Sequence, residues 1–403
     1  MEIKPTVVMM GLGYIGLPTA ALIASKGLNV TGVDISQHVV DTINQGKIHI
    51  VEPELDGLVH YVVKEGYLKA ATKPIMANVY LIAVPTPFKD NHVPDLSYVE
   101  SAVKNIIPTL QKGALVILES TSPVGTTHKI QELIFKERPD LKGEIFIAYC
   151  PERVLPGNVI YELEQNDRAI GGIDDESTEK AVWFYKHFVK GELHKTNSQT
   201  AEMCKLVENS SRDVQIAFAN ELSMICDKAN INVWELIRLA NKHPRVNILQ
   251  PGTGVGGHCI AVDPWFIVSE FPEESKIIRS AREINNYKTE WAIEKVKNTA
   301  LQFKIEHGRD AVIACMGLAF KPNIDDLRES PALRVSQQLD ADGFNVLFVE
   351  PNLNSHDQFK LTSLTEAKKT CDIMVFLVAH KEFKGLNGEI QMQVLDFCGI
   401  INK

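Results

Sequence analysis

Short apolar runs alternate with helical repeats toward both ends of the chain. In the first part, apolar runs at residues 6–10, 28–33, 79–84, 115–118 and 145–148 are separated by stretches with the three- and four-residue spacing of amphipathic helices. The same rhythm returns near the end, where runs at 311–316, 345–349, 372–378 and 394–396 flank a helical stretch at 331–342. This alternation predicts parallel sheets with helices on both faces.

The middle of the chain has a different pattern. From residue 200 to about 241, apolar residues recur at helical spacing, and the run AEMCKLVENSSRDVQIAFANELSMICDKAN contains no glycine or proline. A long helix is expected there, with a second helix after a break at 230–232. We therefore predict an α/β protein of two doubly wound, Rossmann-like domains joined by a central all-helical domain, with boundaries at 1–198, 199–300 and 301–403.

Composition narrows the class of protein. At 403 residues the chain exceeds one ordinary core, and its 45% hydrophobic and 23% charged residues are typical of a globular protein. It has no apolar run of about 18 residues and no secretory signal at its start, which favours a cytoplasmic protein. The net charge of −9, without a basic stripe, argues against nucleic acid or an anionic membrane as a partner.

The run GLGYIG at 11–16 lies between a predicted strand and a predicted helix. Glycines there allow a tight turn and a close approach to a diphosphate, whose charge the helix N-terminus stabilises. The motif alone is a weak signal, but Asp34 ends the second strand about twenty residues later, where a carboxylate binds ribose hydroxyls. Because no arginine follows Asp34, NAD is favoured over NADP; the alternative is a solvated turn aspartate.

Three further segments follow predicted strands. VPTP at 84–87 and ESTSPVG at 119–125 either border the cofactor crevice or are ordinary turns. In CPER at 150–153, Glu152 is expected at the carboxyl edge of the sheet, where a carboxylate can act as a base for water. The alternative for Glu152 is a surface pair with Arg153.

A glycine-rich loop at 252–259, GTGVGGHC, delivers a thiol. Seven cysteines without a C-x-x-C pair argue for reduced thiols and against a zinc site, and no metal is expected. Most cysteines are inert core residues, but Cys259 follows glycines that permit close approach to a ligand, which favours a nucleophile. His258 is either its base, a ligand contact or a packing residue, and Asp263 either positions a water or cation or caps the Pro264 turn.

Two sets of polar residues suit an anionic substrate. Lys205, Asn209 and Arg212 recur at helical spacing on one face of the long helix, either facing solvent or bringing a lysine to a carbonyl. Lys321 and Arg328 follow the first strand of the second α/β part, and arginine binds diphosphate oxygens through its planar fork. The alternative for this pair is a salt bridge to Asp325 or Glu329.

In this order and over nearly the whole chain, GLGYIGLP, VPTP, ESTSPVG, CPERVLPG, GVGGHC and GLAFKPNIDDLRESP resemble the UDP-sugar 6-dehydrogenase family. IHIVEP, the central helix and NKHPRVNILQPGTGVGGHCIAVDPWF look most like its branch that acts on UDP-N-acetylmannosamine. The UDP-glucose branch has serine before the cysteine and Pro-Lys-Asp shortly after it. Here those places hold His258 and AVD at 261–263, which weakens a glucose assignment.

The resemblance implies a four-electron oxidation of the sugar C6 hydroxymethyl group with two NAD⁺, giving a uronic acid used for cell-surface polysaccharide. Cys259 would add to the intermediate aldehyde and pass through a thiohemiacetal and a thioester. The C-terminal domain would bind UDP, and the central helix would join two copies in a homodimer.

The resemblance also assigns roles to individual positions. Lys205 would handle the proton and stabilise the oxyanion, Asn209 and Asp263 would order water, and Glu152 would assist thioester hydrolysis. The residues bordering NAD would be Gly11, Gly13, Tyr14, Ile15, Gly16, Asp34, Thr86, Thr121 and Thr127. The residues around the UDP-sugar would be Arg153, Val154, Lys205, Asn209, Arg212, His243, Arg245, Gly256, Lys321 and Arg328, with His243 and Arg245 in reach of a neighbouring subunit.

Other substrates of the same chemistry stay open, namely UDP-glucose, UDP-N-acetylglucosamine and UDP-N-acetylgalactosamine. A two-electron hydroxy-acid dehydrogenase shares an NAD domain and a helical domain but needs no thiol. It would release one NADH per substrate, whereas the four-electron reaction releases two. An NAD-sensing protein without enzymatic activity would release none with any UDP-sugar.

Overall fold

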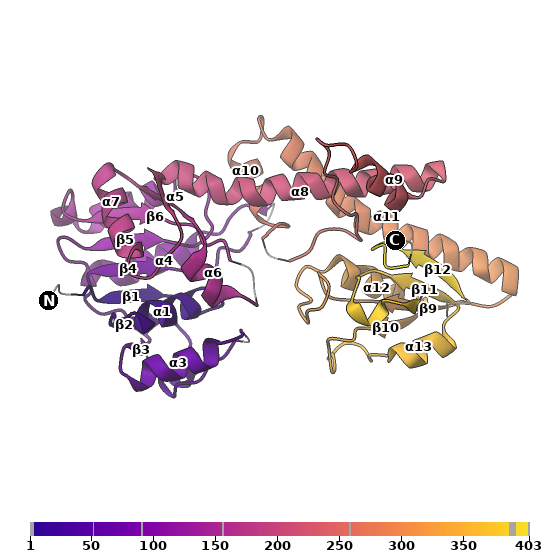
Figure 1. Cartoon of the computed structure of the whole chain (residues 1–403), viewed down its shortest axis with the longest axis horizontal. Coiled ribbons are helices and arrows are strands. Elements are labelled where there is room, and N and C mark those ends of the chain that lie inside the picture. The colour runs from indigo at the N-terminus through magenta and orange to yellow at the C-terminus, as the bar shows by residue number, and fades with distance from the viewer. Residues whose placement is uncertain are drawn as a thin grey trace. The chain divides into compact units, whose positions relative to one another are not determined.

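The protein forms two compact units, Met1–Val207 and Glu208–Lys403. The structure is a computed structural model that describes residues 4–50, 52–89, 92–154, 157–257, 259–386 and 392–401 (Figure 1). Helix α8 (Ser198–Ala229) begins in the first unit and continues into the second. The three-part division with boundaries at 198 and 300 stays a prediction.

The first unit is built on a sheet with the strand order β3-β2-β1-β4-β5-β6-β7-β8. Neighbouring strands are parallel except for β6 and β7. The strands are β1 (Val7–Met10), β2 (Val30–Val33), β3 (Leu68–Ala71), β4 (Val79–Ile82), β5 (Leu115–Leu118), β6 (Phe146–Tyr149), β7 (Arg168–Gly172) and β8 (Leu193–Asn197).

Helices cover both faces of this sheet, as the apolar runs predict (Figure 1). Alternate residues of β1 belong to different cores: Val7 and Met9 pack into one cluster, Val8 and Met10 into the other. The helices are α1 (Gly16–Ser25), α2 (Gln37–Asn44), α3 (Leu55–Lys64), α4 (Ser97–Ile106), α5 (Thr126–Glu137), α6 (Val159–Gln165) and α7 (Asp175–Tyr185).

The pairing of β6 with β7 departs from the predicted parallel order. Ala148 pairs with Gly172 and Tyr149 with Gly171 in an antiparallel register. Helix α6 is only 7 residues long, and the chain starts β7 beyond the carboxyl end of β6. A parallel strand would require a longer crossover back to the amino edge. The carboxyl edge of the first sheet therefore receives both the end of β6 and the start of β7.

Helices make up the first part of the second unit. After α8 come α9 (Val233–Ala240), α10 (Asp263–Glu270) and α11 (Lys276–His307). Asn230 has a φ of 55°, and the Asn232 side chain accepts hydrogen bonds from Trp234 N and Glu235 N. A left-handed residue followed by an asparagine N-cap ends one helix and starts the next. The predicted break at 230–232 is confirmed.

The second unit ends in a parallel sheet of order β10-β9-β11-β12 with apolar clusters on both faces. Its elements are β9 (Val312–Met316), α12 (Pro331–Ala341), β10 (Asn345–Val349), α13 (Leu364–Thr370), β11 (Ile373–Phe376) and β12 (Gln393–Asp396). The predicted fold class, two Rossmann-like sheets with helices between them in the chain, is confirmed. Within the described ranges, none of the helices combines the length and the apolar composition needed to cross a membrane.

Candidate active site

The loop after β1 needs glycine at two positions for its own packing. Gly11 has a φ of 93°, and a Cβ there would lie 2.5 Å from Ala83 O. A Cβ on Gly16 would lie 1.9 Å from Gly11 O. Gly13 differs, because nothing lies within 4 Å of its ideal Cβ. The first and third glycines therefore serve the turn, whereas Gly13 leaves room for a ligand.

Helix α1 begins directly behind this loop and presents its N-terminus to it. In this helix the N-cap residue Ile15 makes no side-chain capping bond, and the first turn contains no acidic residue. Tyr14, beside the loop, is 51% exposed. N–H groups at the start of a helix that lack a side-chain cap bind phosphate oxygens well. The loop and the helix therefore fit the diphosphate of a dinucleotide.

Asp34 faces the same loop from the end of β2. One of its carboxylate oxygens accepts a hydrogen bond from Leu12 N at 3.1 Å, and the other accepts one from Ser36 N at 2.9 Å. A carboxylate offers about four lone pairs, so Asp34 keeps acceptors for two ribose hydroxyls. The next residue, Ile35, is 93% exposed and carries no charge for a 2′-phosphate. These contacts fit NAD, as predicted.

The loops that carry Thr86 and Thr121 are linked at the carboxyl edge of the sheet. Ser120 Oγ donates a hydrogen bond to Val84 O at 2.7 Å, and both threonines are half-buried. Thr127, at the start of α5, is buried, and its hydroxyl donates to Glu202 Oε1 at 2.6 Å. The contact of these three threonines with NAD stays a prediction.

Glu202 was not foreseen from the sequence as part of this region. Its carboxylate also accepts hydrogen bonds from Gly125 N at 2.6 Å and Thr127 N at 2.8 Å, so it caps α5 from α8. Burial raises the pKa of Glu202, and the hydrogen bonds from Thr127 and Gly125 oppose that rise. Glu202 lies one helical turn before Lys205, which is half-buried on α8. A carboxylate at helical spacing from a candidate catalytic lysine is the signal that could have found it.

Glu152 lies at the carboxyl edge of the first sheet but is only 8% exposed. Its Oε2 accepts a hydrogen bond from Arg168 Nη1 at 2.7 Å, and its Oε1 accepts one from Arg153 N at 2.6 Å. The guanidinium of Arg153 donates to Asp167 O instead. The charge partner of Glu152 is thus Arg168, which was not among the predicted site residues. Val154 is half-buried and packs against the core.

The thiol loop brings three predicted residues of the second unit together. Cys259 is exposed, whereas the other six cysteines, all in described ranges, are buried or half-buried. Its carbonyl oxygen accepts hydrogen bonds from Val262 N and Asp263 N, which starts α10 one turn after the thiol. Asp263 is 3% exposed, and its Oδ2 accepts a hydrogen bond from Asn209 Nδ2 at 2.5 Å. His258 lies outside the described residues.

The glycines of this loop allow it to dock on the segment after β9. A Cβ on Gly256 would lie 2.5 Å from Glu329 O and 2.8 Å from Phe320 Cβ. Gly257 has a φ of 78°, and its N–H donates to Arg328 O at 3.2 Å. The sequence predicts this close approach for a ligand. The structure shows that the backbone of the glycine loop also packs on the segment that carries Lys321 and Arg328.

Arg328 forms the alternative salt bridge, though not with a residue considered for it. Its guanidinium donates to both carboxylate oxygens of Asp326, with distances between 2.6 and 3.0 Å. The side chain is 53% exposed, so the pair is a weak surface contact that leaves Arg328 accessible. Lys321 is half-buried, and its Nζ lies 5.9 Å from the Phe320 ring centroid.

Glu350 holds in the second unit the place that Asp34 holds in the first. It follows β10, and its Oε2 accepts hydrogen bonds from Leu318 N at 2.7 Å and Ala319 N at 3.0 Å. His380 Nε2 lies 3.0 Å from the same oxygen, and both side chains are fully buried. Burial would raise the pKa of Glu350, but hydrogen bonds, first that of His380, lower it to about 2. This carboxylate has no face open to a ribose.

Three of the remaining predicted substrate residues of the second unit are exposed, namely Arg212, His243 and Arg245. Asn209 is half-buried and Arg212 exposed on the same helix, α8, as the helical spacing predicts. His243 and Arg245 follow α9 and are exposed, and Arg245 N donates to His243 Nδ1 at 3.3 Å. Their contact with substrate stays a prediction.

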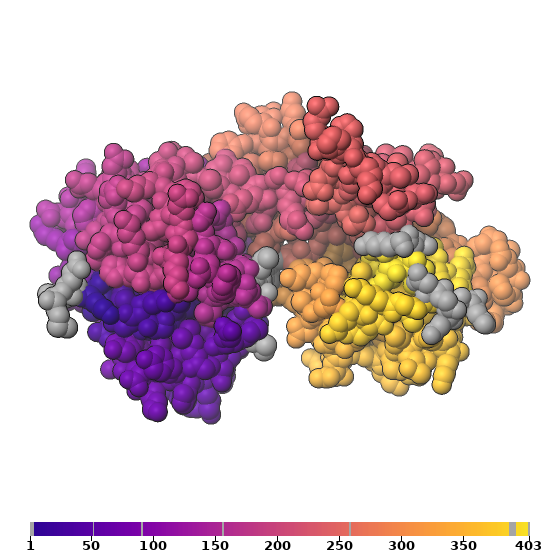
Figure 2. Space-filling model, in the orientation of Figure 1, coloured from indigo at the N-terminus to yellow at the C-terminus, as the bar shows by residue number. Residues whose placement is uncertain are grey.

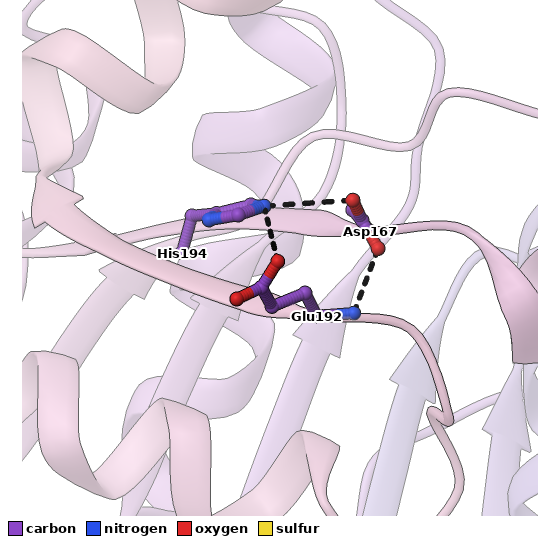
Figure 3. A group of neighbouring side chains, drawn as sticks. All are labelled: Asp167, Glu192 and His194. Atoms are coloured by element: carbon purple, nitrogen blue, oxygen red, sulfur yellow. Dashed lines mark hydrogen bonds and ion pairs between the residues drawn. The ribbon is translucent and has the colours of Figure 1, made fainter.

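A surface cluster in the first unit offers a histidine and two carboxylates within 4.8 Å of one another: Asp167, Glu192 and His194 (Figure 3). His194 Nε2 lies 3.5 Å from Asp167 Oδ2, and Glu192 N donates to Asp167 Oδ1 at 2.7 Å. All three are exposed, and these contacts with one another account for their placement. We assign no metal to them.

Known proteins of one family match the chain. Models of the UDP-glucose/GDP-mannose dehydrogenase family match residues 5–189 (NAD binding domain), 199–287 (central domain) and 314–401 (UDP binding domain). The chain is 55% identical to UDP-N-acetyl-D-mannosamine dehydrogenase from Escherichia coli K12, covering 98% of this chain and 99% of that one.

Two further relatives bear on substrate and fold. NDP-N-acetyl-D-galactosaminuronic acid dehydrogenase from Ralstonia nicotianae is 54% identical over 95% of this chain and 92% of that one. The solved structure of UDP-D-ManNAc dehydrogenase from Pyrococcus horikoshii superposes with a TM-score of 0.87 at 38% identity, covering 99% of this chain and 96% of that one.

Proposed function

The chain belongs to the UDP-glucose/GDP-mannose dehydrogenase family, and on this premise we propose that it oxidises UDP-N-acetyl-D-mannosamine at C6 to UDP-N-acetyl-D-mannosaminuronate. Its membership makes it an NAD-dependent UDP-sugar dehydrogenase, an oxidoreductase. The choice of sugar is supported by the name of the Escherichia coli relative at 55% identity.

The exposed residue Cys259 carries the proposal that this chain performs both oxidations. After the first oxidation, the aldehyde has no hydride to release until a nucleophile adds to its carbon. Cys259 Sγ bonds to that carbon while the thiol proton moves to the carbonyl oxygen, and loss of hydride and of that proton leaves a thioester. Water then adds to the carbonyl carbon, the C–S bond breaks, and the acid and the thiol are released.

NAD⁺, when bound, supplies the hydride acceptor for both oxidations. The balance is one alcohol, one water and two NAD⁺ giving one carboxylate, two NADH and three protons. The open side of Gly13, the N-terminus of α1 and the spare acceptors of Asp34 support the placement of the cofactor.

Other residues order water, transfer protons and bind the ligands in these steps. The bond between Asn209 and Asp263, one turn from the thiol, supports their role in ordering water. Lys205 takes the alcohol proton and stabilises the oxyanion, and Glu152 assists the attack of water on the thioester. Arg153, Val154, Arg212, His243, Arg245, Gly256, Lys321 and Arg328 contact the UDP-sugar, and Tyr14, Ile15, Thr86, Thr121 and Thr127 contact NAD.

A panel of UDP-sugars with NAD⁺ tests the proposal. We expect the highest kcat/KM with UDP-N-acetylmannosamine and two NADH per sugar. Cys259→Ser should stop after the first oxidation and release an aldehyde that semicarbazide traps, whereas Cys204→Ser, a change at a half-buried thiol, should still give the acid. Acid formation at the wild-type rate by Cys259→Ser would overturn the thioester route. Lys205→Ala should lower turnover by about 10²–10⁴-fold.

A second substrate is favoured by one relative. The Ralstonia protein is named for N-acetyl-D-galactosaminuronic acid and is nearly as similar to this chain as the Escherichia coli protein. UDP-N-acetylgalactosamine is therefore the first competitor in the panel, followed by UDP-glucose and UDP-N-acetylglucosamine. A single NADH per substrate would instead indicate a two-electron dehydrogenase.

We also propose a homodimer and a cytoplasmic location. Phe218 and Ile225 on α8 and Leu239 on α9 are 53–57% exposed, and Figure 2 shows that α9 and the carboxyl half of α8 reach the surface. A second copy packed on this apolar surface would bury it. The seven cysteines are thiols, which suits a reducing compartment.

A further inference from the structure

Glu152 is held from behind by a buried arginine. The salt bridge between Arg168 Nη1 and Glu152 Oε2 is 2.7 Å long, and the two side chains are 3% and 7% exposed. Arg168 Nη2 donates to Leu163 O at 3.0 Å, which fixes the guanidinium plane. Together with Arg153 N, this arginine sets the orientation of the Glu152 carboxylate. A buried ion pair of this kind is costly to break from one side.

A second carboxylate lies in the same buried network. Glu119 follows β5 and is 3% exposed, and its Oε1 accepts a hydrogen bond from Tyr185 OH at 2.6 Å. Its Oε2 has no hydrogen-bond partner within the described ranges. The guanidinium of Arg168 lies over the Tyr185 ring, 5.6 Å from its centroid. One cation and two carboxylates thus share an interior region.

Ionisable groups on β7, on α7 and after β6 face Glu119. Arg168 on β7, Glu152 and Cys150 after β6, and Tyr185 on α7 all face it. Burial raises the pKa of Glu119 to about 7, Arg168 opposes the rise, and Glu152 adds to it. Burial raises the pKa of the Cys150 thiol to about 12, so the thiol stays protonated near neutral pH. Glu119 is therefore the member of this network whose charge changes near neutral pH.

We propose that Glu119 is a positioning residue that acts through Arg168 and makes the hold on Glu152, and with it thioester hydrolysis, depend on pH. This inference rests on the proposed function, in which Glu152 assists that hydrolysis. When Glu119 is protonated, Glu152 is the only negatively charged partner of Arg168 in this network. When Glu119 is ionised, Arg168 is shared between two carboxylates, and Glu152 is held less firmly and accepts a proton from water more readily.

The pH dependence of acid release in single turnovers tests this inference. In the wild type, the rate should rise across neutral pH as Glu119 ionises. Glu119→Gln keeps an oxygen for Tyr185 but cannot ionise, so its rate should stay at the low-pH level and fall up to about tenfold below the wild type at alkaline pH. Glu144→Gln, a change at a carboxylate that is 46% exposed in the same unit, should keep the wild-type profile.

A second variant and a spectroscopic signal separate the network from a loss of structure. Tyr185→Phe removes a hydrogen bond that lowers the pKa of Glu119, so the rise in rate should move to higher pH. Difference infrared spectra should show a buried protonated carboxyl that titrates near neutral pH and is missing in Glu119→Gln. A wild-type profile in Glu119→Gln overturns the inference, while two NADH per sugar in the same assay would still support the proposed function.

Discussion

Lys288 gives a prediction about stability whose size follows from the structure. This α11 lysine is 2% exposed, its Nζ donates to Ser223 Oγ at 2.8 Å, and the Trp291 ring centroid lies 3.8 Å away. It lines a cavity of about 430 Å³ between α8, α9, α11 and β12. Burial lowers the pKa of Lys288 to about 7, although Asp227 opposes the shift. We expect Lys288→Met to alter the pH dependence of unfolding.

The sign and size follow from proton linkage. An unfolded lysine has a pKa of about 10.4, so between pH 7 and that value the unfolded chain binds more protons than the folded one. The free energy of unfolding therefore rises with pH over this range, by up to about 1.4 kcal/mol per pH unit for one group. From pH 7 to pH 9 the contribution of Lys288 is about 2 kcal/mol. Lys288→Met removes this contribution while keeping an apolar chain against Trp291.

Urea unfolding followed by tryptophan fluorescence at pH 7 and pH 9 measures this difference. The increase in the free energy of unfolding between the two pH values should be about 2 kcal/mol smaller in Lys288→Met than in the wild type. The control is Lys304→Met, at a side chain on the same helix that is 55% exposed. It should retain the wild-type increase. Equal increases in the wild type and in Lys288→Met would mean that the folded protein keeps Lys288 charged, and the reasoning would be refuted.

Three further changes test separate contacts. Gly256→Ala should destabilise the thiol loop by about 1–3 kcal/mol and reduce turnover, because the added Cβ would meet Glu329 O. The control is Gly252→Ala, where the nearest atom to the added Cβ lies at 3.9 Å. Equal stability of the two variants would contradict the inference that the loop docks on the segment after β9. Glu202→Gln should cost about 1–3 kcal/mol in chemical unfolding, because an amide cannot accept all the bonds from Gly125 and Thr127, whereas the exposed Glu221→Gln should cost little. Phe218→Glu should give monomers in analytical ultracentrifugation. The control is Ile305→Glu, at a residue of α11 that is 78% exposed, and it should leave the dimer intact. A Phe218→Glu variant that stays dimeric would show that the interface lies elsewhere.

The strands with continuous apolar runs could be predicted from the sequence almost to the residue. β5 and β10 begin and end where the runs at 115–118 and 345–349 do. Three strands that were missed lack such runs: β3 reads LKAA, β7 ends in two glycines, and β8 reads LHKTN and has no buried residue. A strand whose side chains face solvent carries little of the pattern on which the prediction depends.

Helix α11 was missed for a different physical reason. It has 32 residues, but part of its buried face is polar. Arg282 and Asn285 contact Asp213 on α8 at 2.6 and 2.8 Å, and Asn285 also accepts a hydrogen bond from Asn220. All four residues are 0–2% exposed. Polar groups in core positions remove the apolar periodicity from the sequence, although in the fold they bond to one another.

The predicted site residues came without the partners that the structure gives them. The spacing of Asn209 on its helix said nothing of Asp263, which meets it through the fold. Glu152 was placed at the correct sheet edge, yet the charge that holds it comes from Arg168 on a strand that was not predicted. Local patterns thus identify candidate groups, and the contacts that set their orientation and charge depend on chain segments far apart in sequence.

The two Rossmann-like sheets begin in the same way and then differ at one carboxylate. Gly11 N donates to Val33 O and Gly317 N to Val349 O, both at 2.8 Å, and the next residue in each loop donates to the carboxylate that ends the neighbouring strand. Asp34 is only partly buried, whereas Glu350 is sealed by His380. His380 Nδ1 in turn accepts a hydrogen bond from Asn323 N, two residues after Lys321. The first acid thus keeps acceptors that fit a ribose, whereas the second holds its own loop, so the two sheets differ in the site that their first loops can form.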